Sequence, residues 1–196
     1  MKSKYTRENI ITLPNPRLRE KSAKVHVITN QTLRLIDDMI TAAIDWENSR
    51  PHEMAVALAA VQIDQPERVV IIRNDFENKN DQTFTVLINP EITKTEGELK
   101  TDHEGCLSVR DVYGLVPRWT KVRVKAVDLS GREIRFRSPN EFVARILQHE
   151  VDHCNGKCFV DHITHDEQAF LVLDSKGELV PYEYSKVKKS GILLND

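Results

Sequence analysis

The stretch SPNEFVARILQHEVDHCNG, residues 138–156, decides the fold because it predicts a helix with two histidines on its buried face. Ser138 is placed to cap this helix, Pro139 suits the first helical position, and Glu141 follows the serine by three residues, which completes a capping-box pattern. We therefore expect the helix to run from this point to about Asn155.

One face of this helix carries both histidines. Phe142, Ile146, His149 and His153 lie at offsets of four, seven and eleven residues, so they share the face that apolar residues turn inward. Glu150 lies about 100° around the helix from His149. In the pattern H-E-x-x-H, two histidines hold a metal and the glutamate is a general base. The alternative is two core histidines bonded to backbone carbonyls, with Glu150 on a solvated flank.

The segment HEGCLS, residues 103–108, offers a third ligand in Cys106. A thiolate is a strong ligand for zinc and for iron. The alternative is that Cys106 is a small buried apolar residue, the usual fate of a free cysteine. That alternative suits Cys154 and Cys158 better, because Cys154 directly follows His153 and points elsewhere around the helix.

The first half of the chain predicts one long helix and two buried strands. Apolar residues recur at spacings of three and four in residues 30–48, which indicates an amphipathic helix. Residues 54–63, MAVALAAVQI, are apolar nearly throughout and fit either a strand or a helix. Residues 67–74 and 83–92 carry β-branched clusters typical of buried strands.

The second half predicts two hairpins. Apolar and charged residues alternate on both sides of a turn at 128–131, which indicates an antiparallel hairpin over residues 121–137. Residues 169–184 repeat the hairpin pattern, and we expect the last residues, 185–196, to be loosely held. The predicted class is α+β, with mostly antiparallel strands around a central metal-binding helix.

Composition narrows the functional classes. The chain has 196 residues, enough for one ordinary core, and we expect a single domain over residues 1–196. A formal net charge of -2 gives no general attraction to nucleic acid or to anionic membranes. No apolar run follows the basic start of the chain, so we expect neither signal peptide nor membrane anchor and place the protein in the cytoplasm. Three cysteines predict free thiols or a metal ligand rather than disulfides.

Three segments together resemble the peptide deformylase family. EGCLS at 104–108 and QHEVDH at 148–153 look like its second and third motifs, and AVALAAVQ at 55–62 resembles its first motif, G-x-G-L-A-A-x-Q. Shorter segments, 15–19 and 87–90, are also similar, and the resemblance covers roughly residues 9–165. It implies a metal-dependent hydrolase that removes the formyl group from the N-terminal formyl-methionine of nascent polypeptides.

The resemblance also implies roles for individual residues. Cys106, His149 and His153 would hold one divalent metal, Fe²⁺ in the cell, with Zn²⁺, Ni²⁺ or Co²⁺ possible in purified protein. Glu150 would move the proton, while the Gln62 amide and the Leu107 backbone N–H would stabilise the oxyanion. The residues expected to bind substrate are Ala55, Val56, Ala57 and Gly105.

The chain departs from the family in two places. Ala55 and Ala57 stand where the first motif has glycine, which predicts weakened or altered substrate binding without loss of metal. The C-terminal hairpin and tail, residues 166–196, stand where many members carry a long helix, and we expect them to change the ribosome contact or the oligomeric state. The expected partners are the formylated nascent peptide and, transiently, the ribosome, with no membrane and no specific nucleic acid.

Two alternatives remain at this level. A deformylase-like homologue with altered substrate or only a binding role would fit the alanines of the first motif. A zincin-type peptidase would take its third ligand downstream of the helix, where Asp161, His162 and His165 are available. The upstream Cys106 motif favours the deformylase interpretation.

Overall fold

The computed structural model describes residues 5–50 and 53–194, and these residues form an α+β fold with an antiparallel sheet, as the sequence predicts. Within that part of the chain the strand order is β1-β2-β3-β4-β6-β7, and β5 pairs with β4. The helices and strands are α1 (Asn30–Asn48), β1 (Ala57–Ala59), β2 (Val69–Arg73), β3 (Phe84–Cys106), β4 (Val109–Val127), β5 (Glu133–Arg137), α2 (Glu141–Cys154), β6 (Phe170–Leu173), β7 (Leu179–Pro181) and α3 (Tyr184–Lys189).

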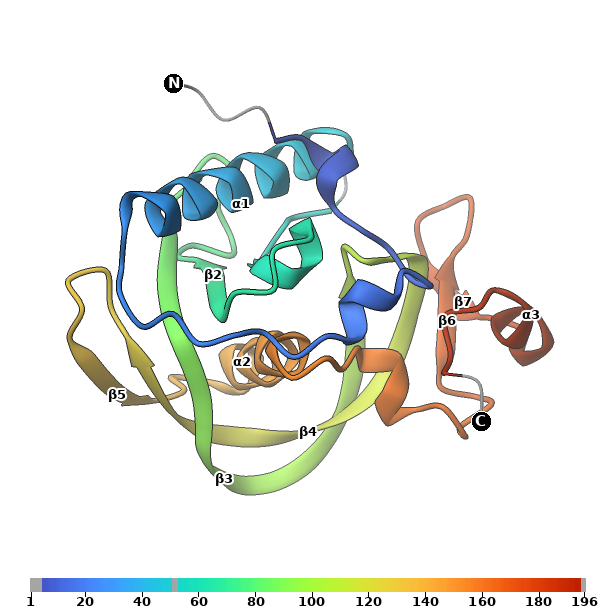
Figure 1. The fold of residues 1–196 in the computed structure, drawn as a ribbon. Coiled ribbons are helices and arrows are strands. Elements are labelled where there is room, and N and C mark those ends of the chain that lie inside the picture. Colours follow the sequence, from blue (N-terminus) through green and yellow to red (C-terminus); the bar gives the residue numbers. More distant parts are fainter. Residues whose placement is uncertain (1–4, 51–52, 195–196) are drawn as a thin grey trace.

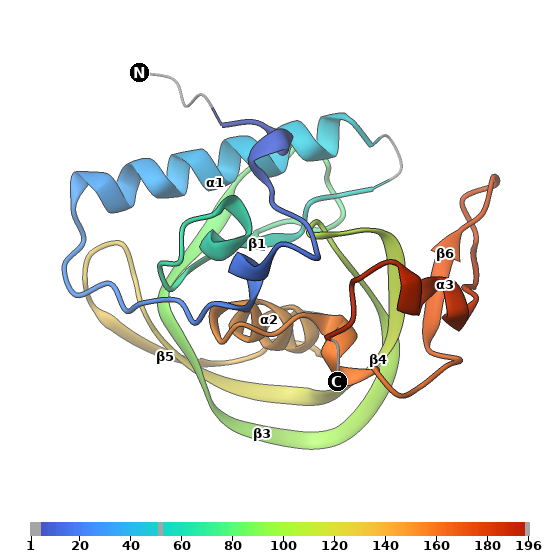
Figure 2. The same cartoon turned by 45° about the vertical axis from the view of Figure 1, so that its right-hand side comes forward.

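The helix α2 lies inside the curve of the long strands β3 and β4 (Figure 1). Register shifts along the β3–β4 pair break the ladder at several points, and bulges of this kind bend strands. The curved hairpin therefore surrounds a helix that a flat sheet would only cover. β1 and β2 lie on the other side of α2, between it and α1 (Figures 1 and 2).

The predicted start of α2 is wrong by two residues. Asn140, not Ser138, caps the helix, and its Oδ1 accepts a hydrogen bond of 2.8 Å from the backbone N–H of Val143. Ser138 is instead buried, where its Oγ accepts the backbone N–H of Val122 at 3.2 Å. Pairing with β4 therefore takes the serine away from the helix end, which sequence spacing alone cannot reveal.

The inward face of α2 is correctly predicted except at its first turn. Ile146, His149 and His153 are buried, whereas Phe142 is 49% exposed. The Phe142 ring packs edge-on against Phe76, with ring centroids 5.1 Å apart. The prediction fails here because the Phe142 ring lies at a cavity, where it contacts Phe76, and is not covered by the core.

The predicted long helix is confirmed as α1, capped by Thr29, whose side chain accepts the N–H groups of Gln31 and Thr32. Its buried face includes Ile36 and Met39, but Leu33, which belongs to the same apolar pattern, is 44% exposed. The ambiguous segment 54–63 is divided between strand β1 and a short 3₁₀ helix, Ala60–Ile63. Neither a whole strand nor a whole α-helix is correct for it.

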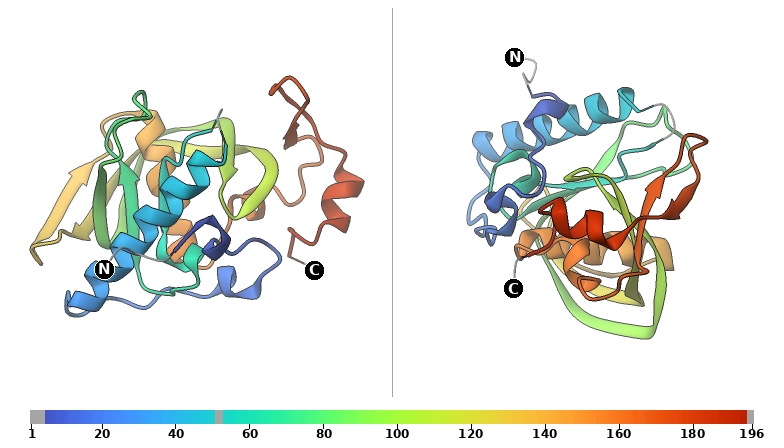
Figure 3. Two further views of the ribbon diagram at one scale, coloured as in Figure 1. Left: turned by 90° about the horizontal axis from the view of Figure 1, so that it is seen from above. Right: turned by 90° about the vertical axis from the view of Figure 1, so that its right-hand side faces the viewer.

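The C-terminal residues form an arm at one end of the molecule, shown at the right of the left-hand view in Figure 3. β6 and β7 confirm the predicted hairpin. The prediction of a loosely held tail is wrong for residues 185–194, because the side chains of Val187 and Ile192 are buried in a core cluster with Leu18 and Phe159. Residues 195 and 196 lie outside the described part. No described helix is both long and apolar enough to cross a membrane.

Candidate metal centre

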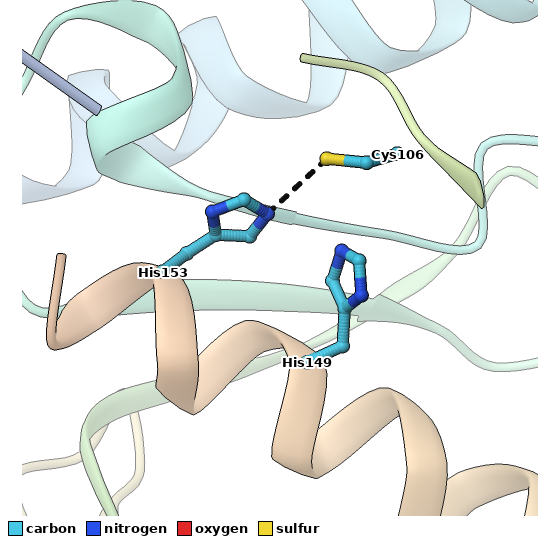
Figure 4. Close-up of side chains that lie close together, drawn as sticks. All are labelled: Cys106, His149 and His153. Atoms are coloured by element: carbon cyan, nitrogen blue, oxygen red, sulfur yellow. Dashed lines mark hydrogen bonds between the residues drawn. The ribbon is translucent and has the colours of Figure 1, made fainter. Parts of the chain in front are cut away.

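Three potential metal ligands converge between α2 and the end of β3. The donor atoms of Cys106, His149 and His153 all lie within 4.8 Å of one another. Cys106 Sγ is 3.2 Å from His153 Nε2, and both imidazoles rise from α2 toward the sulfur (Figure 4). The spacing of four residues places the two rings one turn apart on one helix face, with ring centroids 4.9 Å apart. The structure thus brings together the three residues that the sequence offers as metal ligands.

Neighbouring N–H groups orient the cysteine sulfur. Cys106 ends β3, and the backbone N–H of Ser108 points at its Sγ over 3.4 Å. The Gln62 Nε2 also lies 3.4 Å from this sulfur and donates to Ser108 Oγ at 3.1 Å. Gln62 is fixed from its other end, because its Oε1 accepts the Ala59 N–H at 2.8 Å. The turn after β3 and the 3₁₀ helix after β1 therefore both contribute to fixing the position of the Cys106 sulfur.

A buried carboxylate orients His149. Glu104 Oε2 is 2.9 Å from His149 Nδ1, so a proton donated from Nδ1 leaves Nε2 free to act as a ligand. Arg118 makes two hydrogen bonds to this carboxylate, at 2.8 and 3.1 Å, and Arg145 adds a third at 2.8 Å. Burial raises the pKa of Glu104, but the hydrogen bonds from His149 and Arg118 outweigh it and keep that pKa well below its ordinary value.

The sequence interpretation missed this arginine cluster. Arg118 Nη1 also bonds Asp152 Oδ2 at 2.5 Å, and His162 Nε2 lies 2.7 Å from the same oxygen. Glu104 lies in the EGCLS motif, so the sequence could have indicated its place at the site. Nothing in the sequence around Arg118 or Arg145 indicates that they belong to it. Among the described residues, the only cluster with metal-ligand geometry is the Cys106 set, so the downstream ligand of the zincin alternative is not supported.

Glu150 is buried beside the donors. Its side chain is 4% exposed, and its Oε2 has no hydrogen-bond partner among the described residues. Burial raises the pKa of Glu150 to about 7. The solvated-flank alternative is therefore wrong, and the carboxyl group is placed to exchange a proton near neutral pH.

His153 is fully buried, and burial lowers its pKa well below the ordinary histidine value. It is therefore neutral at physiological pH, as a ligand must be. One thiol and two imidazoles form a donor set that suits a divalent transition metal. The unpartnered oxygen of Glu150 lies next to this set without belonging to it. The residues present therefore fit one metal ion with a free carboxyl group beside it.

A cavity of about 120 Å³ opens onto the donors. Of the four residues expected to bind substrate, Val56, Ala57 and Gly105 line it, together with Gln62 and Leu107. The Leu107 backbone N–H has no backbone acceptor within the described ranges, which leaves it available to a bound molecule.

Ala55 occupies a different environment from Ala57. Its side chain is fully buried in the core under α1, its N–H donates to Glu47 Oε2 at 2.9 Å, and its carbonyl accepts from Arg73 Nε at 3.2 Å. Ala57 belongs to β1, pairs with Ile72 and faces the cavity. Neither alanine has a positive φ, so the backbone at these positions does not require glycine.

Comparisons with known proteins match this arrangement. The family model described as polypeptide deformylase matches residues 7–169. Peptide deformylase 1 of Vibrio vulnificus is 38% identical over 156 residues, which cover 79% of this chain and 85% of the relative. Peptide deformylase of Agrobacterium fabrum is 37% identical over 155 residues, or 79% of this chain and 86% of the relative.

Solved structures give the same result. A peptide deformylase from Synechococcus elongatus in complex with actinonin has a TM-score of 0.71 at 28% identity, covering 94% of this chain and 86% of that one. A Met-Ala-Ser-bound class I type b peptide deformylase from Acinetobacter baumannii has a TM-score of 0.68 at 31% identity, covering 83% of this chain and 100% of that one. This chain therefore belongs to the polypeptide deformylase family.

Proposed function

We propose that this protein removes the formyl group from the N-terminal formyl-methionine of nascent polypeptides, using Cys106, His149 and His153 as metal ligands. The observation that carries the proposal is the convergence of these three donor atoms within 4.8 Å, next to the buried carboxyl group of Glu150. A bound divalent metal acts as a Lewis acid and lowers the pKa of a coordinated water.

The protein's own groups supply the proton transfer and the oxyanion contacts. Glu150, whose buried carboxyl group lines the cavity beside the ligands, takes a proton from the attacking water and returns it to the departing amine. The Gln62 Nε2 and the Leu107 N–H are the donors for the formyl oxygen, because both lie at the cavity beside Cys106. Removal of one such donor typically costs about 100-fold or more in kcat.

The edge of the sheet supplies a place for the peptide backbone. β1 is the terminal strand of the described sheet and pairs with β2, so its other edge has no strand partner among the described residues and could pair with an added strand. We assign the substrate backbone to this edge, between Val56 and Ala57 on one side and Gly105 on the other. The Acinetobacter baumannii relative, whose structure contains bound Met-Ala-Ser, supports a tripeptide-sized ligand for this chain.

Thiolate and imidazole donors suit iron, zinc, nickel and cobalt, and availability in the cell decides among these metals. We assign Fe²⁺ as the cellular metal. Elemental analysis of protein purified anaerobically from iron-supplied cells tests this. Zinc as the main metal under these conditions would contradict the assignment.

We also assign a transient contact with the ribosome to the arm, where Lys186, Lys188 and Lys189 of α3 are exposed. Co-sedimentation with ribosomes at low salt tests this contact. Equal co-sedimentation of the triple Lys→Glu variant would contradict it.

The decisive experiment measures formate release by iron-loaded, anaerobically purified protein from formyl-Met-Ala-Ser. We expect release from this peptide, loss of activity in Glu150→Ala with metal retained, and loss of metal in Cys106→Ser. Cys154→Ser is the matched control, because Cys154 is buried outside the donor set and should retain both metal and activity. No formate release from any formylated peptide would contradict the proposed function.

A further inference from the structure

A continuous groove leads from the metal centre to the C-terminal arm. One cavity of about 250 Å³ is lined by Cys106 and Leu107, and a second, of about 1110 Å³, is lined by residues of the β6–β7 hairpin. Both cavities are also lined by Arg50, Glu53 and Tyr113, so the two spaces adjoin along these side chains. We propose that the outer part of this groove, between Ser49, Arg50 and Glu53 on one side and the β6–β7 hairpin on the other, binds the substrate polypeptide beyond its first three residues. This assignment rests on the proposed function.

Tyr113 joins the inner and outer parts of the groove. A Cβ added to Gly105 would lie only 2.7 Å from the Tyr113 ring, so the ring packs directly on the strand that ends at the metal ligand Cys106. The Tyr113 hydroxyl donates to Glu53 Oε2 at 2.7 Å. The same side chain therefore contacts the wall of the catalytic cavity and the segment that borders the outer groove.

Salt bridges fix the floor of the groove. Arg50 Nη1 lies 2.8 Å from Glu53 Oε1 and 2.9 Å from Asp111 Oδ1. Groups of both signs, held in place and partly exposed, offer hydrogen bonds to peptide N–H and C=O groups without selecting one charge of side chain. Such a floor suits substrates that share a backbone but differ in sequence.

The hairpin contributes an apolar wall. Leu173 and Leu179 pair across β6 and β7 and line the groove. Both are only half-buried, and neither belongs to the hydrophobic clusters of the described core. The next pair, Val172 and Val180, points to the opposite face of the hairpin and does not line this groove. A half-buried leucine pair on one face is thus available to contact substrate side chains.

The size of the substrate and the position of the arm favour a polypeptide as the occupant. The catalytic cavity of about 120 Å³ has room for about one large side chain, so the rest of a nascent chain must leave it. An extended chain advances about 3.3 Å per residue, and it would enter the outer groove within a few residues. The matching family model ends at residue 169, so the hairpin wall lies outside the matched region.

The test compares two formylated substrates, formyl-Met-Ala-Ser and a nine-residue peptide that starts with the same three residues and carries leucine at positions five and six. We expect kcat/KM to be higher for the longer peptide by roughly five- to tenfold, mainly through KM, as for covering about 50 Å² of apolar surface. The double variant Leu173→Thr with Leu179→Thr should remove this advantage and leave the rate on formyl-Met-Ala-Ser unchanged. Threonine retains the strand preference of the hairpin.

The matched control is Val172→Thr with Val180→Thr, on the other face of the same strands, which should keep the full advantage of the longer peptide. A photo-crosslinking residue at position five should attach to residues 173–179 in the unmodified protein. Equal kcat/KM for both peptides, or an unchanged ratio in the leucine variant, would overturn the groove assignment while leaving deformylation intact. Inactivity toward both peptides would instead contradict the proposed function and, with it, this assignment.

Discussion

Each of the two walls of the catalytic cavity contains a buried glutamate–arginine ion pair, but the two glutamates accept hydrogen bonds from different kinds of group. On the α2 side, Glu104 is buried against Arg118 and bonds the imidazole of His149. On the β1 side, Glu47 is buried against Arg73 at 2.6 Å and bonds the backbone N–H of Ala55. One carboxylate therefore orients a metal ligand, and the other orients the strand that borders the substrate.

This difference separates metal binding from substrate binding in space. Glu104 and Glu47 are 6% and 1% exposed, so both ion pairs are equally out of reach of solvent. Loss of Glu47 leaves Arg73 with backbone carbonyl acceptors, whereas loss of Glu104 leaves Arg118 paired with Asp152, so removal of Glu47 should cost more stability. Only the α2 wall should change the metal affinity, because only its carboxylate contacts a ligand.

The largest effect is expected for Glu104→Ala. Loss of the acceptor for His149 Nδ1 should lower metal affinity by about 10- to 100-fold, the usual cost of removing a group that orients a ligand. Stability should also fall, by less than the roughly 3–5 kcal/mol of a fully broken buried pair, because Arg118 keeps its ion pair with Asp152. Titration of the metal-free variant with Co²⁺ or Zn²⁺ measures the affinity, and unaltered affinity would show that His149 needs no orienting carboxylate.

Glu47→Ala is the matched variant on the opposite wall. It should lower the free energy of unfolding by about 3–5 kcal/mol, because Arg73 is fully buried. KM should rise, because the Ala55 N–H loses its acceptor and the strand edge loosens, but affinity for Co²⁺ should equal that of the original protein. A fall in metal affinity as large as that of Glu104→Ala would erase the distinction between the walls.

A third buried carboxyl group, Glu150, has no arginine partner and so behaves in the opposite way. Burial raises its pKa from an ordinary 4.5 to about 7. Between pH 4.5 and about 7, Glu150 is protonated in the folded metal-free protein but ionised in the unfolded chain. The free energy of unfolding therefore falls as pH rises through this range. The loss is on the order of 3 kcal/mol.

Urea unfolding of metal-free protein between pH 5 and 8 checks this, with Glu150→Gln as the comparison. The variant should lack this part of the pH dependence and exceed the original protein in stability at pH 8. Parallel pH profiles for the two proteins would contradict the raised pKa.

The two walls were not equally predictable from sequence. The α2 wall carries a helical period, so the spacing of His149 and His153 already places them on one buried face. The partners that hold these walls join positions far apart in the chain, such as Glu104 with Arg145 and Glu47 with Arg73. No local period records such pairs, because they form only when β3 and β4 curve around α2 and when α1 packs against β2.

The predictions of the start of α2 and of a loosely held C-terminal tail failed for a related reason. Ser138 and Asn140 are both good caps, and the choice depends on the hydrogen bond that Ser138 makes to β4. Likewise, Val187 and Ile192 are buried by residues from other parts of the chain, including Leu18. Tertiary contacts decide both cases over local propensity.

The smallest effects are expected at Ala55 and Ala57, where the chain departs from the first motif of its family. The two alanines should differ in their effects, because only Ala57 lines the cavity. Ala57→Gly removes a methyl group from the cavity and should lower KM by roughly two- to threefold, about 0.5 kcal/mol. Ala55→Gly removes one from the core beneath α1, so stability should fall by about 1 kcal/mol with KM unchanged.

Steady-state kinetics on formyl-Met-Ala-Ser and thermal unfolding of both variants separate the two outcomes. Since neither alanine has a positive φ, a gain in stability from either glycine is not expected. If both substitutions left KM unchanged, the methyl groups would not narrow the substrate site, and the departure from the family motif would concern packing alone. A KM effect confined to Ala57→Gly would instead locate the altered substrate contact on β1, which the cavity lining predicts.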